Sequence, residues 1–122
     1  MPENDFGKFL KALRKKHKGT QIAKQAGISY VYLLDIEKGA RPVPSNKVLL
    51  ALAESFNLKN EELEMFFNLA ATQKNEIPLD IANFIKNNRC SYSFFRTLKK
   101  LSLKDEQWES LEKSIINHFR EV

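Results

Sequence analysis

The side chains with the clearest chemistry to offer are the basic residues of the first half of the chain. Residues 1–58 contain ten Lys and Arg against five Asp and Glu, a net charge of +5, whereas residues 59–122 contain ten of each. Most of the excess comes from Lys8, Lys11, Arg14, Lys15, Lys16, Lys18 and Lys24. Such a surface suits the binding of a polyanion, and the alternative is a solvated helix face that keeps the protein in solution.

Side chains that could carry out catalysis or bind a metal are few and scattered. Cys90 is the only cysteine, so an internal disulfide and a thiolate metal site are excluded. His17 and His118 have no acid, cysteine or glycine-rich loop arranged around them in the sequence, and solvated helix histidines account for both. We therefore expect no enzyme activity, no cofactor and no metal site.

The length and the apolar pattern limit the architecture. A chain of 122 residues suffices for one compact domain, or for a domain of about sixty residues with an appended module. Every apolar stretch is interrupted by charge before the roughly twenty residues that a membrane span needs. The N-terminus MPENDF also lacks the features of a signal peptide. We expect a cytoplasmic protein without a membrane-bound part.

Apolar residues at helical spacing predict five short helices within about the first seventy residues. The first covers about residues 4–17, with Phe6, Leu10 and Leu13 on its apolar side. Gly27 and Gly39 are expected to end the second and the third. The expected N-caps of the later four helices are Thr20, Ser29, Ser45 and Asn60.

The run YVYLL at residues 30–34 favours a strand by propensity. A strand needs a pairing partner, and the first half of the chain has no other alternating segment, so we interpret the run as the start of the third helix. On a helix, Leu33 and Ile36 face inward with Tyr32 at the border. The residues that face outward are then Tyr30, Val31 and Asp35.

The second half begins with the polar stretch TQKNEIP, residues 72–78. We expect it to be a linker between a domain of residues 1–71 and a C-terminal region of residues 79–122. Apolar spacing predicts three further helices in that region. Ser102 and Asp105 match a capping box at the start of the last one.

A short helix, a turn with glycine and a second short helix form a helix-turn-helix, whose second helix enters the major groove of DNA. The sequence resembles the Cro and lambda-repressor-like (XRE) family over about residues 6–70. The resemblance rests on FGKFLKALRKK and on Gly27, Ile28, Ser29, Tyr32, Leu33, Ile36, Glu37, Gly39, Pro44, Ser45, Leu49, Leu52 and Ala53. It implies an all-α fold, with a five-helix lambda-repressor-like DNA-binding domain followed by a short three-helix dimerisation module.

Two positions depart from the family pattern. Thr20 and Gln21 run straight into Ile22 and Ala23, where the family has two further residues between the corresponding pairs. The second helix is therefore expected to start later than usual. Leu34 stands where the family commonly has serine, and an apolar residue there cannot donate to a phosphate.

The outward residues of the third helix are the expected readers of base edges. Val31 can meet a thymine methyl, Asp35 can accept from a cytosine amino group, and Tyr30 offers a ring and a hydroxyl. Glu37 is expected to pair with a basic residue of the first helix or the following loop. The residues expected to contact or position the DNA backbone are Thr20, Gln21, Ser29, Lys38, Arg41, Asn46 and Lys47.

Repressors of this kind bind two-fold symmetric sites as dimers. The residues expected to hold two copies together are Trp108, Leu111, Ile115 and Phe119; the alternative is a C-terminal bundle docked on its own first domain. The pattern IPLDIANFIKNN with two further helices also looks like the C-terminal part of compact repressors of phages and integrative elements. Some of those are inactivated by a partner metalloprotease, so a regulatory protease or another protein is a possible partner.

The leading hypothesis is a sequence-specific DNA-binding transcriptional regulator. We expect a homodimeric repressor of a bacterial, phage or mobile-element promoter that reads an inverted repeat in double-stranded DNA with the helix at residues 29–38. The alternative is a protein-binding adaptor, such as an antitoxin or inhibitor, that retains the helix-turn-helix fold.

Overall fold

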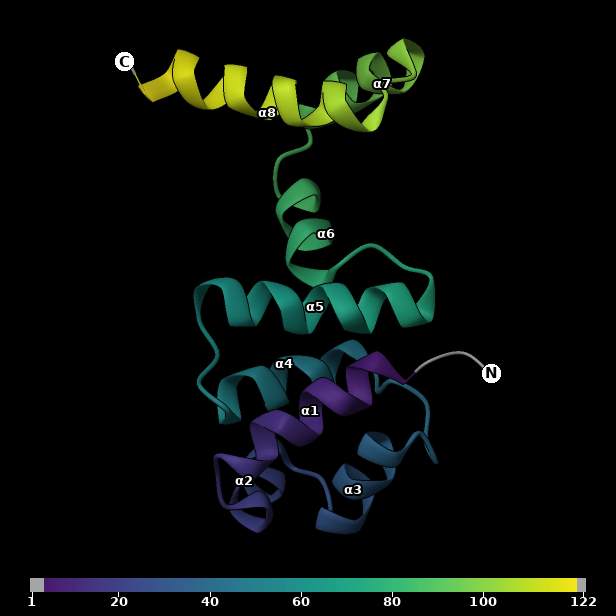
Figure 1. Ribbon diagram of the computed structural model, residues 1–122, viewed down its shortest axis with the longest axis vertical. Coiled ribbons are helices and arrows are strands. Elements are labelled where there is room, and N and C mark those ends of the chain that lie inside the picture. The colour runs from purple at the N-terminus through teal and green to yellow at the C-terminus, as the bar shows by residue number, and fades with distance from the viewer. Residues whose placement is uncertain (1–3, 121–122) are drawn as a thin grey trace. The chain divides into compact units, whose positions relative to one another are not determined.

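A computed structural model describes residues 4–120, and in that range the chain is entirely helical and forms no strand (Figure 1). The chain divides into two compact units, one ending at Phe84 and one beginning at Ile85. The helices are α1 (Asp5–Lys15), α2 (Gly19–Ala26), α3 (Tyr30–Lys38), α4 (Asn46–Ser55), α5 (Asn60–Lys74), α6 (Leu79–Lys86), α7 (Ser91–Leu101) and α8 (Asp105–Arg120). The all-α fold class is therefore as the sequence predicts.

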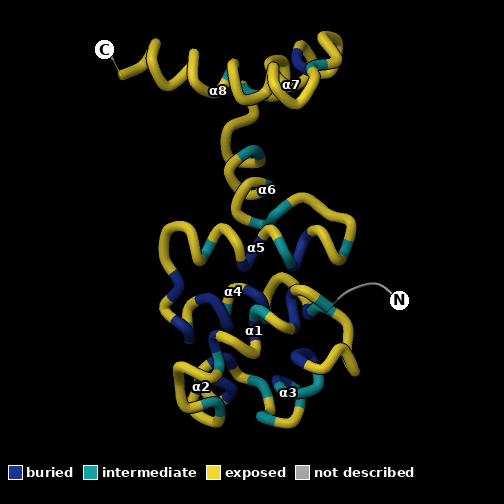
Figure 2. Tube along the Cα trace, in the orientation of Figure 1, coloured by how far each residue is buried: buried dark blue, intermediate teal, exposed yellow. Residues whose placement is uncertain are grey.

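The core of the first unit lies among α1 to α5. Helix α1 packs on α3 and α5, and α2 packs on α4. Phe6 and Phe66 have no exposed surface and their ring centroids are 5.3 Å apart, so they join α1 to α5. Figure 2 shows buried segments in every one of these five helices. The expected apolar side of α1 is confirmed, because Leu10 and Leu13 are buried with Phe6.

The ends of α3 are fixed as the sequence predicts. The Ser29 hydroxyl accepts a hydrogen bond of 3.0 Å from the Tyr32 amide, which caps the first turn. Gly39 ends the helix in the left-handed conformation with φ of 79°, and Gly27 ends α2 in the same way with φ of 74°. Such φ values favour glycine.

The prediction that Thr20 caps α2 is wrong, and so is the later start expected for that helix. Helix α2 begins at Gly19, and its N-cap Lys18 makes no side-chain capping bond. A Cβ at Gly19 would lie 2.7 Å from a ring carbon of Tyr30 and 2.9 Å from Arg14 Cδ. The first residue of α2 therefore lies against side chains of both α1 and α3, and a residue larger than glycine there would force Tyr30 or Arg14 to shift.

The capping box at Ser102 is also wrong. Ser102 is the C-cap of α7, in the left-handed region with φ of 50°. Helix α8 begins at Asp105 instead, and Gln107 reaches back to accept a 2.8 Å hydrogen bond from the Lys104 amide. The cap of α8 is thus supplied from inside the helix, two residues later than expected.

The polar stretch at residues 72–78 is partly helical, because α5 continues to Lys74. Beyond it α6 has no buried residue, while Leu79 packs on the core of the first unit. In α7 and α8 only Leu98 is buried. No helix within residues 4–120 is long and apolar enough to cross a membrane. The proposed division into functional domains stays a prediction.

Replacing Leu33 by alanine should strongly destabilise the first unit. Leu33 has no exposed surface, so the substitution removes buried apolar groups and leaves a cavity, at a cost of about 2–5 kcal/mol. Urea denaturation followed by circular dichroism measures the change. Val31→Ala on the same helix is the matched control, since Val31 is 68% exposed, and its free energy of unfolding should change by less than about 0.5 kcal/mol.

Candidate nucleic-acid interface

Helix α3 is held on the first unit by a buried ion pair with α1. The Arg14 Nε lies 3.0 Å from Glu37 Oε1 and 2.7 Å from Oε2. The Glu37 side chain is only 3% exposed, and Glu37 is the one buried charged residue in the part of the chain that the structure describes. The expected pairing of Glu37 with a base of the first helix is confirmed.

The electrostatics of this pair favour its charged form. The hydrogen bond to Glu37 raises the pKa of the Arg14 guanidinium above its ordinary value; partial burial acts against this, and the charge of the carboxylate adds to it. A raised pKa of a base contributes stability at every pH below the unfolded value. The contribution from Arg14 is therefore present throughout the physiological range.

A second contact fixes the C-terminal end of α3. The Asn4 side-chain amide donates a 2.9 Å hydrogen bond to the Glu37 carbonyl, and its oxygen accepts from the Gly7 amide at 3.2 Å. The same oxygen accepts from Gln73 Nε2 at 3.1 Å. A Cβ on Gly7 would collide with Asn4 and with the Glu37 carbonyl. The close approach of α1 to α3 thus requires glycine at position 7.

The outward face of α3 is less uniform than the sequence predicts. Val31 is 68% exposed, whereas Tyr30 and Asp35 are half-buried. Tyr30 packs against the core, and its ring lies close to Gly19 at the start of α2. Leu34 is half-buried too. Val31 is therefore the residue of the predicted trio that projects furthest, and Tyr30 joins the helices as well as bordering the surface.

Helices α2 and α3 are joined by a turn at residues 27–29 and form a helix-turn-helix. The second of them, α3, is anchored at both ends and exposes both polar and apolar side chains. The helix-turn-helix family model matches residues 10–63 of the chain. The chain carries an XRE-type helix-turn-helix domain. This domain is of a DNA-binding regulatory family, and it supports a DNA-binding transcriptional regulator of XRE type. Searches among curated proteins and among solved structures found no match.

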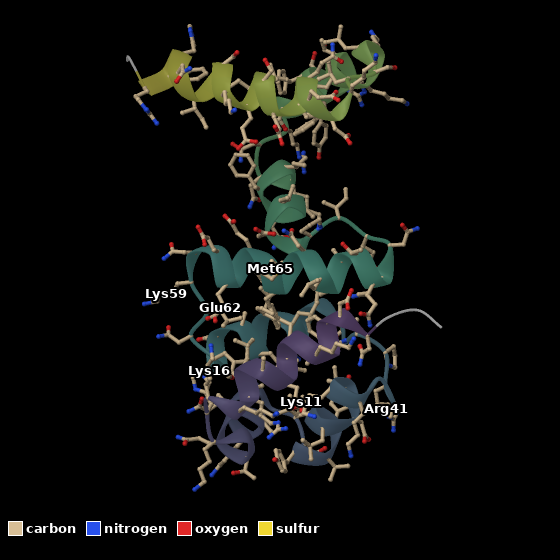
Figure 3. The ribbon with its side chains drawn as sticks, in the orientation of Figure 1. Lys11, Lys16, Arg41, Lys59, Glu62 and Met65 are labelled. Atoms are coloured by element: carbon tan, nitrogen blue, oxygen red, sulfur yellow. The ribbon has the colours of Figure 1, made fainter. Side chains whose placement is uncertain are left out.

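The seven residues expected to contact or position the DNA backbone are all exposed on the surface of the XRE-type domain. They are Thr20, Gln21, Ser29, Lys38, Arg41, Asn46 and Lys47. Thr20 and Gln21 border a shallow polar hollow on α2 together with Lys18 and Lys24. Figure 3 marks Arg41 in the loop after α3, Lys11 on α1 and Lys16 at the C-cap of α1. The earlier start of α2 therefore leaves Thr20 and Gln21 in its first turn.

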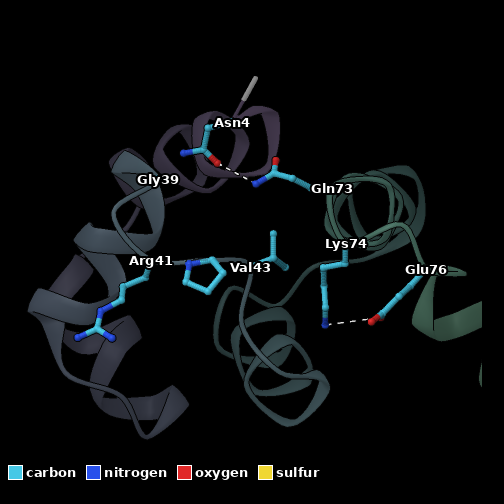
Figure 4. Close-up of a pocket in the computed structure, with 8 residues that line it drawn as sticks. Asn4, Gly39, Arg41, Val43, Gln73, Lys74 and Glu76 are labelled. Atoms are coloured by element: carbon cyan, nitrogen blue, oxygen red, sulfur yellow. Dashed lines mark hydrogen bonds and ion pairs between the residues drawn. The ribbon is translucent and has the colours of Figure 1, made fainter. Parts of the chain in front are cut away.

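The loop that carries Arg41 is supported from α5. Lys74 Nζ donates a 3.2 Å hydrogen bond to the Pro44 carbonyl and lies 3.6 Å from Glu76 Oε2. Figure 4 shows Asn4, Val43, Gln73 and Lys74 around an open hollow of about 560 Å³, with the Arg41 side chain extending away from Lys74. The hollow thus separates the end of α5 from the exposed guanidinium.

Asn4, Gln73 and Lys74 are supporting residues that sequence reasoning missed. Asn4 was detectable, because an asparagine before a helix is a common N-cap and its side chain does accept from Gly7. Gln73 and Lys74 contact residues that are 69 and 30 positions away along the chain, and no local pattern predicts such pairs.

The residues expected to join two copies all lie on α8 in the second unit. Trp108 is 47% exposed, Ile115 39% and Phe119 68%, and Leu111 is half-buried. Within residues 4–120 no three His, Cys, Asp or Glu side chains gather where they could hold a metal ion.

Val31→Ala should weaken binding to the specific operator by about 1–2 kcal/mol, because it removes the methyl groups offered to a thymine methyl. Fluorescence anisotropy with operator DNA and with a scrambled duplex measures the effect. Binding to the scrambled duplex should stay the same. Equal affinity of the variant and the parent for the operator would contradict a base-reading role of Val31.

Arg41→Ala should act differently, because a phosphate contact carries no sequence information. Affinity should fall by a similar factor for operator and scrambled DNA, and the slope of log K against log salt should become shallower by about 1. Lys59→Ala is the control: Lys59 is the N-cap residue of α5 and lies away from the predicted DNA contacts. A change confined to the operator would show that Arg41 reads bases instead.

Proposed function

We propose that this protein is a homodimeric, sequence-specific repressor of a bacterial, phage or mobile-element promoter. The observation that carries the proposal is the anchoring of α3. The buried Arg14–Glu37 pair and the Asn4 contact fix its C-terminal end, Ser29 caps its start, and Val31 stands out from it. A helix held in this way presents its side chains in one geometry, which base recognition requires.

Base reading is assigned to Tyr30, Val31 and Asp35. Val31 meets a thymine methyl, and Asp35 accepts from a cytosine amino group. Tyr30 contacts the DNA with the exposed part of its ring or its hydroxyl, while the rest of the side chain packs on the domain. Because Asp35 is half-buried, its carboxylate can reach only a base that lies directly against α3.

Affinity is assigned to the seven exposed residues around the helix-turn-helix and to the net charge of +5 in residues 1–58. These groups approach the backbone from two sides, from the start of α2 and from the segment between α3 and α4. Lys38, Arg41 and Lys47 neutralise phosphates, and the polar side chains hydrogen-bond to them. This term is independent of sequence and sensitive to salt.

Two copies are needed to cover an operator, because one recognition helix spans only a few base pairs. Two-fold symmetric binding places half-sites about 34 Å apart or at a multiple of that distance. The second unit supplies the contact between copies in this proposal, through Trp108, Leu111, Ile115 and Phe119. The exposure of Trp108, Ile115 and Phe119 supports the assignment, since large apolar side chains in water favour association.

A protein-binding adaptor is the second candidate. The exposed apolar residues of α7 and α8 favour it, because they fit another protein as well as a second copy. The start of α2 gives the adaptor no support, because the helix begins at Gly19 and is not shortened there. An obligate partner recovered at one-to-one stoichiometry in a pull-down at high salt would favour the adaptor.

The DNA upstream of the gene should contain an inverted repeat that the protein binds tightly. In fluorescence anisotropy, log K should fall with log salt at a slope of about −0.9 per phosphate neutralised. Transcription from that promoter in vitro should fall when the protein is added. Weak, sequence-indifferent binding at moderate salt would contradict the proposal, and stimulated transcription would contradict the repressor role.

A further inference from the structure

The second unit has an apolar groove that no part of the unit covers. The groove, of about 400 Å³, runs between α7 and α8 and is lined among others by Phe94, Phe95, Trp108 and Ile115. Figure 2 shows both helices exposed along most of their length. Within residues 85–120 the unit has one buried apolar side chain, Leu98, and a unit of about forty residues with so small a core is too small to be stable alone. The groove therefore needs a cover.

One edge of α8 beside this groove is divided by charge. Asp105, Glu109 and Glu112 lie on it in the first half of the helix, and Glu109 and Glu112 line the groove itself. Lys113 and Arg120 continue the same edge in the second half. Asp105, Glu109 and Glu112 follow one another at spacings of four and three residues, Lys113 comes directly after Glu112, and Arg120 lies seven residues further on. At about 100° per residue, all five side chains fall within roughly a third of the helix circumference. The edge is acidic at its start and basic at its end.

These charges have no partner within the unit. Among the described residues the structure contains the ion pairs Arg14–Glu37 and Lys74–Glu76, and none within residues 85–120. All five side chains of the edge are exposed. They are therefore free to meet charges of another molecule at the border of the groove.

An edge that is acidic at one end and basic at the other can pair with the same edge of a second copy when the two helices run antiparallel. When two copies of α8 lie antiparallel about a two-fold axis, the acidic half of each meets the basic half of the other. When they lie parallel, like charges meet. Since the same surface supplies both sides, a second copy of this chain fits the pattern without any further partner.

We propose that α8 of a second copy lies antiparallel over the groove, with the two-fold axis near Glu112 and Lys113. Glu112 then faces Lys113 of the second copy, and Asp105 faces its Arg120. The groove residues Phe94, Phe95 and Trp108 are buried between the copies, so apolar burial supplies the affinity and the charged edge sets the orientation. This inference rests on the proposed homodimer and adds its geometry.

Reversing one half of the edge should weaken the dimer, because like charges then face each other. An acid-reversed chain carries Asp105→Lys and Glu112→Lys, and a base-reversed chain carries Lys113→Glu and Arg120→Glu. Sedimentation equilibrium at low salt, without DNA, should give each variant a dimer dissociation constant raised about tenfold or more. An equimolar mixture of the two should form a heterodimer as tight as the parent dimer.

The mixture is also the folding control, because a chain that fails to fold cannot be rescued by its counterpart. A further control is Ser110→Lys with Asn117→Lys, which adds positive charge to the face of α8 away from the groove and should leave dimerisation unchanged. If the acid-reversed and base-reversed chains each dimerise as tightly as the parent, the antiparallel pairing of α8 is wrong, although the protein is still a homodimer. A parent chain that stays monomeric at all concentrations would overturn the homodimer as well.

Distances between spin labels give an independent measurement. With Cys90→Ser in the background, one chain carries a label at Ser114→Cys and another at Glu106→Cys. In the antiparallel pair the labels at 106 should be separated along the helix axes by about 15 Å more than those at 114, because each residue adds about 1.5 Å along the helix on both sides of the two-fold axis. Equal separations at the two positions would overturn the antiparallel arrangement.

Discussion

The buried carboxylate of Glu37 is the constraint on which the position of α3 depends. A buried charge is costly unless it is paired and hydrogen-bonded, and Arg14 satisfies both of its oxygens from α1. The register between α1 and α3 is thereby fixed at one point. Asn4 ties the carbonyl of the same residue to the start of α1, and Gly7 lets the two helices approach closely enough for that contact. The surface of α3 inherits its geometry from these contacts.

The two units differ in how much apolar surface they bury. The first unit buries large side chains from α1 to α5 around Phe6, Leu33 and Phe66 and can support an exposed, charged surface. The second unit has two helices and very little interior, so its apolar groups remain at the surface. A helix-turn-helix unit with a core of its own is thus followed by a segment that leaves its apolar side chains exposed.

Much of the first unit was predictable because its signals are local. Ser29 and Gly39 mark the ends of α3, and the spacing of Leu33 and Ile36 sets its inner face, as the structure confirms. The expected caps at Thr20 and Ser102 fail for different reasons, and Asn60 is the first residue of α5 and not its cap. Thr20 and Ser102 are good capping residues by type, but Gly19 is placed by the approach of Tyr30 and Arg14, and Gln107 caps α8 from within. Contacts from elsewhere overrode the local preference in the first case, and a competing local contact did so in the second.

The sequence by itself determined the helical fold, the helix-turn-helix, the segregation of positive charge into the first half and the apolar side of the last helix, because each follows from residue type and spacing along one segment. Only the tertiary structure decided that Tyr30 is half-buried while Val31 projects, that Asn4, Gln73 and Lys74 support α3 and its following loop, and that the groove of α7 and α8 lies open. These features depend on which distant segments come together, and spacing along one helix carries no information about its neighbours.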